Sequence, residues 1–446
     1  MKLRYSMWVP AANCAVLLTA LAVATPLAAQ EHPARHSGND SRYILKDLGT
    51  AGGPNSYVQD VTNPVNNERT VVGIADTALP DPFDPFCIYD CFVVHAFQWQ
   101  RGVLTDLGAL TPGGSSLPNG INAAGMVAGF SETGAVDPTF EFPPEFHAVV
   151  WNLGQIIDLG TFGGTLSYAN AINDRGQVVG FALNGESDSF INTSSDFDGN
   201  CGTGDVPSQM RAFVWQEGRG LRDLGTLGGP DSCAKFINER GQIAGHSFTS
   251  YTPNGNTGIP TFEPFIWTNG TMTGLGTLGG TEGHASGINN RGQVAGSSKL
   301  AGDETQHAFF WSQGAMQDLT PANDYDSGSH ALNDQGEVVG EMFNGDSWDA
   351  FLWTGGVLTD LGACSTAFSI NSKSQIVGQA SACADGSHAF LWENGGPAID
   401  LNTLVPQGSG VALTKATHVT DAGEITAQGV LANGDEHAFL LIPRKN

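Results

Sequence analysis

Basic residues are scarce in this 446-residue chain, which has 19 lysines and arginines against 45 aspartates and glutamates and a formal net charge of −26 at pH 7. Nucleic acids and anionic membranes are bound mainly through Lys and Arg side chains that neutralise phosphate groups. We therefore expect no nucleic-acid ligand. The acidity fits either the solubility of an exported protein or a preference for cations or neutral sugars as ligands.

The chain also lacks the motifs of common enzyme classes. It has no Gly-x-Ser-x-Gly elbow, no His-Glu-x-x-His pattern and no phosphate-binding glycine loop followed by Lys. A propeller-type glycosidase or lyase would need no motif, since two loop carboxylates brought together by folding suffice. We expect a non-catalytic binding or scaffold protein, and a polysaccharide-degrading enzyme is the alternative.

The first 29 residues differ from the rest of the chain. Lys2 and Arg4 precede a mostly apolar stretch from Val9 to Leu27, and small residues follow. This pattern predicts a signal peptide over residues 1–29, cleaved on export. A retained anchor is the rival reading, but prolines interrupt the stretch, which is short for a span of about 20 apolar residues. We expect a flexible segment over 30–42 and a secreted protein, extracellular or periplasmic, with no membrane insertion.

A repeated unit extends from Tyr43 to the C-terminus. Each copy has a segment ending in Asn, a turn, a segment like Gln-Val-Val-Gly, a variable stretch, a segment like His-Ala-Phe-x-Trp, a turn and Asp-Leu-Gly. The Asn position holds Asn66, Asn122, Asn173, Asn238, Asn289, Asn333, Asn371 and Thr420. The first aromatic-segment position holds His95, His147, Arg211, Glu263, His307, Asp349, His388 and His437. The unit therefore occurs eight times.

Each unit contains four short β-branched and apolar runs separated by Gly and Asn or Asp turns, without helical spacing. Four consecutive strands form a meander, and repeated meanders predict an all-β, eight-bladed β-propeller of four-stranded antiparallel blades over residues 43–446. The last unit lacks its final strand, whereas residues 43–49 form an extra one. We expect this N-terminal strand to join the last blade and close the ring. A solenoid, the other repeat architecture, would need capping units.

The repeats resemble the HAF family of bacterial extracellular proteins, named for the tripeptide that begins at His95, His307, His388 and His437. The resemblance covers nearly all of residues 43–446. It implies export and a repeat architecture, and it supplies no catalytic residues. Many relatives carry a C-terminal sorting tail that this sequence lacks, so we expect release to the periplasm or medium.

The repeated residues have structural explanations. Phe and Trp that alternate on one strand point to the same face, where they can fill the space between blades. The five repeat histidines occupy equivalent places on diverging blades, too far apart to converge on one metal ion. We expect them to form hydrogen bonds within their strands.

Candidate binding residues come from the places where the repeats differ. Insertions between second and third strands run roughly over 76–94, 131–146, 183–210 and 247–263, and such insertions map to loops on one face. The aromatic candidates in these loops are Phe83, Phe86, Tyr89, Phe140, Phe142, Phe190, Tyr251 and Phe262. Together with nearby carboxylates they could bind a carbohydrate or a protein. Alternatively, they pack the loops against the body. We expect a monomer.

Six cysteines remain after the signal peptide, an even number that favours disulfides in an exported chain. The propeller phase predicts the pairs Cys87–Cys91, Cys201–Cys233 and Cys364–Cys383, acting as staples of the loops.

One insertion carries oxygen ligands at alternate positions, as a calcium loop does. The candidate calcium ligands are Asp196, Asp198, Asn200 and Asp205. The match is incomplete, because Cys201 stands where an EF-hand has Gly and no Glu closes the loop. We expect no other cofactor.

Overall fold

The structure is a computed structural model that describes residues 41–59, 63–83, 91–136, 144–188, 190, 197, 201, 206, 208–255, 257–380 and 386–444. The predicted signal peptide and most of the expected flexible segment lie outside these residues. Among the described residues, no helix is long and apolar enough to cross a membrane.

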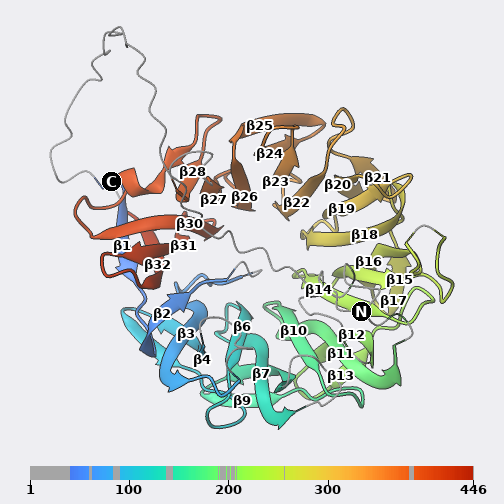
Figure 1. Cartoon of the computed structure of the whole chain (residues 1–446), viewed down its shortest axis with the longest axis horizontal. Helices are drawn as coiled ribbons and strands as arrows, with labels where there is room; N and C mark the ends of the chain where they lie inside the picture. The colour runs from blue at the N-terminus through green and yellow to red at the C-terminus, as the bar shows by residue number, and fades with distance from the viewer. Residues whose placement is uncertain are drawn as a thin grey trace, which may run out of the picture. The chain divides into compact units, whose positions relative to one another are not determined.

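The described part of the chain is all-β and forms six four-stranded sheets and one eight-stranded sheet. The eight-stranded sheet consists of two four-stranded antiparallel units, which a single parallel pairing between Phe262 and Glu282 joins. In Figure 1 the four-stranded units follow one another around a common centre, with the first strand of each unit innermost.

The strands are grouped here by unit. They are β2 (Gly52–Tyr57), β3 (Val71–Pro80), β4 (Phe92–Gln100) and β5 (Val103–Asp106); β6 (Ser116–Ile121), β7 (Val127–Val136), β8 (Pro144–Asn152) and β9 (Gln155–Asp158); β10 (Ser167–Ile172), β11 (Gln177–Ser187), β12 (Ser208–Gln216) and β13 (Gly220–Asp223); β14 (Ser232–Ile237), β15 (Ile243–Phe248), β16 (Phe262–Thr268) and β17 (Thr271–Gly274); β18 (Gly279–Ile288), β19 (Val294–Leu300), β20 (Gln306–Ser312) and β21 (Ala315–Asp318); β22 (Ser327–Leu332), β23 (Val338–Phe343), β24 (Trp348–Thr354) and β25 (Val357–Ala363); β26 (Ser365–Ile370), β27 (Ile376–Ala380), β28 (His388–Trp392) and β29 (Ile399–Asp400); β30 (Val411–Val419), β31 (Ile425–Leu431) and β32 (Glu436–Pro443) with β1 (Tyr43–Asp47).

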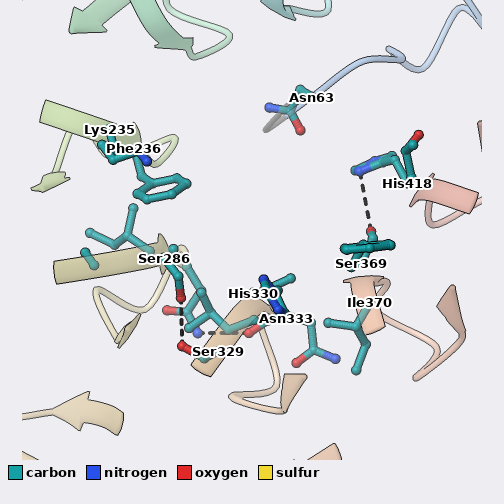
Figure 2. Close-up of a pocket in the computed structure, with 18 of the residues that line it drawn as sticks. Asn63, Lys235, Phe236, Ser286, Ser329, His330, Asn333, Ser369, Ile370 and His418 are labelled. Carbon is teal, nitrogen blue, oxygen red and sulfur yellow. Dashed lines mark hydrogen bonds between the residues drawn. The ribbon is translucent and has the colours of Figure 1, made fainter. Parts of the chain in front are cut away.

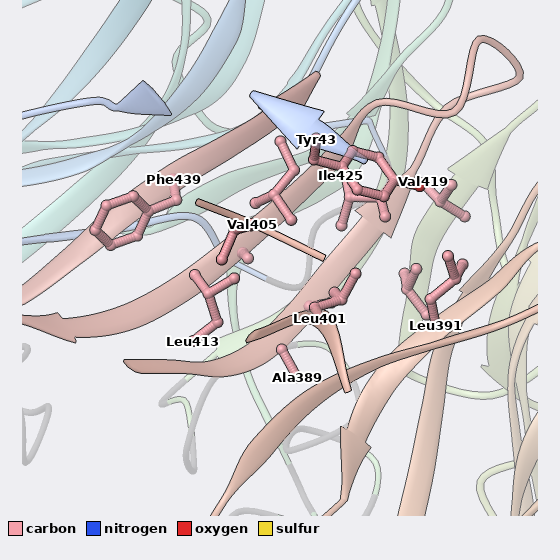
Figure 3. Packing of buried hydrophobic residues seen from close by; sticks show 13 residues of the cluster. Tyr43, Ala389, Leu391, Leu401, Val405, Leu413, Val419, Ile425 and Phe439 are labelled. Carbon is pink, nitrogen blue, oxygen red and sulfur yellow. The ribbon is translucent and has the colours of Figure 1, made fainter. Parts of the chain in front are cut away.

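The N-terminal strand joins the C-terminal unit, as the sequence predicts. β1 pairs antiparallel with β32 from Tyr43 opposite Pro443 to Asp47 opposite Phe439. Tyr43 is buried, and its amide donates to the Leu404 carbonyl after the short 3₁₀ helix η1 (Leu401–Thr403). Figure 3 shows Tyr43 in one hydrophobic cluster with residues of the last two units, among them Leu401. The two chain ends are thus held together by both backbone pairing and apolar burial.

Apolar side chains from neighbouring units form the core between sheets. In β12, Phe213 and Trp215 both face the preceding unit and pack in one cluster with Ala128 and Val150. The prediction that the alternating Phe and Trp fill the space between sheets is therefore confirmed. Side chains two positions apart on a strand share a face, which accounts for this arrangement.

Close packing within the sheet requires the glycine of the Gln-Val-Val-Gly segment in seven of the eight units, and the last copy has Ala427 at this position. A Cβ atom at Gly180 in β11 would overlap the Tyr168 carbonyl oxygen of β10. The same clash with a carbonyl of the adjacent inner strand would occur at Gly73, Gly129, Gly245, Gly296, Gly340 and Gly378. The repeat therefore keeps Gly where the inner strand leaves no room for a side chain.

The repeat asparagine both closes its own turn and ties its unit to the next. The Asn173 Oδ1 atom accepts hydrogen bonds from the amides of Arg175 and Gln177, and its Nδ2 atom donates to the Asn238 carbonyl of the next unit at 3.1 Å. Equivalent bonds to the next unit start at Asn66, Asn122, Asn238, Asn289, Asn333 and Asn371. The bond from Asn371 ends on Thr420, which replaces Asn in the last copy.

A different interaction joins the last copy to the first. Thr420 donates to Glu424, and Arg69 of the first copy donates from Nε to Glu424 Oε1 at 2.5 Å. The Glu424 side chain is buried. The Arg69–Glu424 ion pair therefore connects the last copy to the first, where no asparagine bond is available from Thr420.

The repeat histidines bond to the aspartate of the neighbouring outer strand. His95 Nδ1 lies 2.9 Å from both carboxylate oxygens of Asp106, and His147 and His437 contact both oxygens of Asp158 and Asp47 in the same way. His307 Nδ1 lies 2.9 Å from one oxygen of Asp318, and His388 Nδ1 lies 3.5 Å from Asp400. Burial alone would raise the pKa of Asp106, but the hydrogen bonds from His95 and from the Gly108 amide outweigh it and lower the pKa. The expectation that the repeat histidines form hydrogen bonds within their sheets is confirmed for His95, His147, His307 and His437.

The predicted disulfide between Cys201 and Cys233 is present. It connects the long β11–β12 insertion to the innermost strand of the next unit, and both cysteines are buried. Cys91 and Cys364 are disulfide-bonded as well. The predicted partners Cys87 and Cys383 lie outside the described residues.

Candidate functional site

A cavity of about 1200 Å³ lies among the innermost strands. Its lining residues come from every four-stranded unit and extend from Ser327 and Gly328, at the start of β22, to Asn333 and Asp334 beyond its end. Figure 2 shows lining side chains from β14, β18, β22, β26 and β30 around one space, among them Lys235, Ser286, His330, Ser369 and His418.

A bulge in seven of the eight inner strands adds a residue that lines the cavity. In β10 the pairing with β11 skips from Ala169 to Ala171, and the extra residue is Asn170. A bulge adds one residue to one strand and redirects its side chain. The residues at the equivalent positions are Asn119, Lys235, Ser286, His330, Phe368 and Thr417, and the cavity is lined by all of them.

The bulged positions hold Asn, Lys, Ser, His, Phe and Thr. The position before them holds Ala or another small residue in six of the inner strands, namely Ala169, Ala234, Ala285, Ser329, Ala367 and Ala416. The position three residues after them is the repeat Asn, or Thr420 in the last copy. The repeat therefore keeps a small residue before the bulge in most units and Asn three residues after it, whereas the bulged side chain varies.

The side formed by β14, β18, β19 and β22 is rich in cationic and imidazole groups. Burial lowers the pKa of Lys235 to about 8. Burial lowers the pKa of His284 to about 3, and the nearby charges of Lys235, His330 and Lys299 contribute. At neutral pH, Lys235 is therefore mainly protonated whereas His284 is neutral and can donate one hydrogen bond and accept another.

Hydroxyl and imidazole groups also line the cavity. Ser286 Oγ and Ser329 Oγ are 2.7 Å apart, and Ser329 donates to the Gly296 carbonyl. On the opposite side, Ser369 Oγ lies 3.4 Å from His418 Nδ1 (Figure 2). Burial lowers the pKa of His418 to about 4.

A carboxylate of the cavity wall is already engaged by neighbouring side chains. Thr366 donates to Glu341 Oε2 at 2.6 Å, and His330 Nε2 lies 3.7 Å from Glu341 Oε1. Burial raises the pKa of Glu341, but the contacts with His330 and Thr366 outweigh it and lower the pKa. Glu341 is therefore an anion that lies beside His330.

Aromatic rings stand where β23 connects to β24. Trp348 lines the cavity and is 42% exposed. The Phe343 ring packs between Trp348 and Tyr325, with centroid distances of 5.6 Å and 5.5 Å. Phe343 thus supports one side of Trp348, while the exposed part of the indole can stack on a ligand.

The structure places the predicted aromatic candidates in different environments. Phe190 and Phe262 are buried in one cluster with Phe197 and Phe248, so packing is the role that the structure displays for them. Tyr251 is 56% exposed. The remaining described candidate, Phe83, is half-buried. Phe86, Tyr89, Phe140 and Phe142 lie outside the described residues.

The predicted calcium ligands Asp196, Asp198, Asn200 and Asp205 also lie outside the described residues. Within the described part of the chain, Cys201, Cys233 and His246 form a buried group with metal-ligating atoms close together. The two sulfurs are joined in the disulfide, which leaves no thiolate for a metal ion. His246 Nε2 lies 3.2 Å from Cys201 Sγ and from the Phe197 carbonyl.

Sequence reasoning concentrated on the insertions and missed the cavity residues. A signal was nevertheless present, because the position three residues before the repeat Asn varies among the later copies while the Asn itself is kept through the first seven. Lys235, Ser286, His330 and Phe368 occupy it in consecutive units.

No protein-family model matches the chain, and no curated protein is significantly similar to it. Among solved structures, the chain is similar to the β-propeller domain of the Trilobed protease from Pyrococcus furiosus, with a TM-score of 0.45 and 10% identity over 78% of this chain and 97% of that chain. It is also similar to an acylaminoacyl peptidase from Pyrococcus horikoshii, with a TM-score of 0.44 and 13% identity over 84% of this chain and 57% of that chain. For TolB from Acinetobacter baumannii the TM-score is 0.32, with 11% identity over 72% of this chain and 80% of that chain. At these identities and TM-scores, no function is transferred.

Proposed function

We propose that this chain is an exported, non-catalytic, monomeric β-propeller of eight HAF-type blades, which binds a polar ligand in the cavity among its inner strands. The variation at the bulged positions carries this proposal. Residues with structural roles repeat from copy to copy, whereas the bulged positions that line the cavity hold Asn, Lys, Ser, His, Phe or Thr.

The lining also supports a binding role. Ligand pockets combine apolar and aromatic surface with a few placed polar groups. Here Phe368 and Trp348 supply the former, and Lys235, His330 and Ser286 supply the latter. The Cys201–Cys233 disulfide supports a location outside the cytoplasm, because disulfides persist in oxidising compartments.

A cavity-filling variant tests the proposal. Ser286→Phe places a large side chain in the cavity, and the fold should accept it because Phe368 occupies the equivalent position two units later. Thr105→Phe, on the exposed strand β5, is the matched control. Ligands would be sought by thermal shift and capture on a panel of saccharides, polysaccharides and cell-wall polymers.

We expect at least one ligand to bind the parent protein and Thr105→Phe equally and to lose affinity for Ser286→Phe. Ligands that bind all three proteins equally would place the site elsewhere and overturn the cavity proposal. In that case the exposed Tyr251 of the fourth insertion would be tested next by Tyr251→Ala. Release of new reducing ends from a polysaccharide would replace the binding role with the enzymatic one.

A further inference from the structure

The sixth unit exposes a tryptophan at a strand position that is buried in several other units. Trp348 begins β24, pairs with Phe343 of β23 and directly precedes Asp349, which occupies the repeat-histidine position here. In the fifth and eighth units the equivalent residue is polar. In the four units with insertions it is apolar and buried, namely Val94, Phe146, Met210 and Phe262.

The insertions explain why the equivalent residues are buried. Phe146, Met210 and Phe262 pack in one cluster with insertion residues that include Phe190 and Phe197. The connection between β23 and β24 spans residues 344–347 and is too short to form such a cover. The Trp348 side chain therefore stays 42% exposed. An exposed large ring at the edge of a cavity favours contact with a ligand.

The Trp348 ring is held in place from one side. Phe343 packs between Trp348 and Tyr325, with ring centroid distances of 5.6 Å and 5.5 Å, and Tyr325 is itself 46% exposed. Ordering a side chain on binding costs conformational entropy, and a ring that is already supported loses less of it. The sixth unit therefore presents a preformed aromatic surface.

Polar groups of two chemical kinds lie on the same stretch of the cavity wall. Lys299 and Gln306 face each other across β19 and β20, Asp326 precedes β22, and all three line the cavity together with Trp348. The Gln306 backbone amide donates to Asp326 Oδ1 at 2.7 Å, which fixes the carboxylate between the fifth and sixth units. Among the described residues, the Lys299 ammonium and the Gln306 carboxamide have no side-chain hydrogen-bond partner.

This combination favours a neutral ligand that carries hydroxyl groups. A charged ligand would meet a like charge in either Lys299 or Asp326, and a wholly apolar one would take both groups from water without a partner. A hydroxyl can accept a hydrogen bond from Lys299 or Gln306 and donate one to Asp326. Sugar rings offer such hydroxyls at their edges and apolar C–H faces that stack on an indole.

We infer that the ligand of this cavity is a neutral oligosaccharide, which stacks one sugar ring on Trp348 and bonds through its hydroxyls to Lys299, Gln306 and Asp326. This inference rests on the proposed function, because it names the ligand class of the same cavity. The cavity volume of about 1200 Å³ exceeds the range of about 300 to 1,000 Å³ typical of small-molecule pockets. It therefore has room for more than one sugar ring.

The test is titration calorimetry with neutral hexasaccharides, namely cellohexaose, laminarihexaose, maltohexaose, mannohexaose and xylohexaose. Hexamers of glucosamine and of galacturonate serve as cationic and anionic comparisons of similar length. We expect at least one neutral hexasaccharide to bind the parent protein and to bind more tightly than either charged hexamer. Ser286→Phe should weaken the same binding, because the cavity is shared.

Variants of the aromatic and polar groups locate the sugar. Trp348→Ala should weaken binding about tenfold or more, whereas Trp348→Tyr keeps an aromatic ring and should retain most of the affinity. Lys299→Met and Asp326→Ala should each weaken binding severalfold. Tyr251→Ala removes an exposed aromatic ring of the fourth insertion and, as the matched control, should leave binding unchanged. Circular dichroism of each variant checks that the fold is kept.

The outcomes separate this inference from the proposed function. Binding of a neutral hexasaccharide that Ser286→Phe abolishes but Trp348→Ala leaves unchanged would overturn the stacking role and keep the cavity as the site. Preference for a charged hexamer would overturn the neutral class. Failure of all the hexasaccharides to bind would overturn the inference as well, while another ligand blocked by Ser286→Phe, a protein included, would still support the proposed function.

Discussion

Replacing a repeat asparagine should destabilise the protein more than a surface substitution does. Asn238 is buried, and its Nδ2 atom donates to the Asn289 carbonyl of the next unit at 2.9 Å and to Gln242 Oε1 at 2.9 Å. Its Oδ1 atom accepts from the amides of Arg240 and Gln242. Asn238→Ala removes all four bonds and leaves backbone groups without their partners.

The magnitude follows from the cost of buried polar groups. A net contribution of about 0.5 to 1.5 kcal/mol per hydrogen bond, and about 1 to 3 kcal/mol for a buried group left unsatisfied, predicts a loss of about 3 to 4 kcal/mol. Asn238→Asp separates the two roles, because a carboxylate still accepts from the turn amides but cannot donate to the Asn289 carbonyl. It should therefore retain the turn and lose the connection between units.

The assay is equilibrium unfolding in guanidinium, followed by tryptophan fluorescence and circular dichroism. Asn433→Ala is the control, because Asn433 is exposed and its side chain bonds only within a surface turn in the described structure. A loss below about 0.5 kcal/mol for Asn238→Ala, comparable to that of an ordinary surface substitution, would refute the reasoning. The asparagine series would then not hold neighbouring units together.

Three further predictions concern stability. Burial raises the pKa of Glu132 to about 7, so the folded state binds its proton more tightly than the unfolded state. Stability should fall by up to about 3 kcal/mol as pH rises from about 4.5 to 7, and Glu132→Gln should remove this part of the pH dependence in melting curves. Gly180→Ala should prevent folding or cost several kcal/mol in unfolding titrations, because its Cβ would overlap the Tyr168 carbonyl; unchanged stability would contradict the packing argument. Removing the Cys201–Cys233 disulfide, which closes a loop with a sequence separation of 32 residues, should cost about 3 to 4 kcal/mol in a Cys201→Ala/Cys233→Ala variant. Unfolding titrations of the variant and the parent, both without reductant, measure this loss and leave the disulfides of Cys91 and Cys364 intact.

The regular features of the structure were predictable because the residues that produce them recur in each copy of the repeat. The alternation of Phe and Trp, the glycine before a close inner strand and the strand order all follow from local rules of side-chain direction and turn chemistry. The pairing of β1 with β32 was predictable for a different reason. The last copy lacks a strand that the first segment of the chain supplies, and an unpaired sheet edge is unfavourable.

The interactions between units were less accessible from sequence. That His95 bonds to Asp106 could be expected from their places on neighbouring strands. The hydrogen bond from Asn238 to the carbonyl of Asn289 could not be expected from sequence, because the two residues are adjacent only through the packing of consecutive sheets. The insertions show the same limit. Phe190, Phe262 and Tyr251 are all aromatic residues of insertions, but Phe190 and Phe262 are buried in the core and Tyr251 is exposed.

The sequence by itself determined the all-β architecture, the four-strand unit, the Cys201–Cys233 disulfide and the partner of the first strand, because local spacing and turn residues specify them. Only the tertiary structure decided where Lys235, Ser286 and His330 point. Side chains alternate from one face of a strand to the other, and one bulged residue changes that alternation. The shared cavity of these residues therefore depends on bulges and on the arrangement of whole sheets around a centre, which no single repeat encodes.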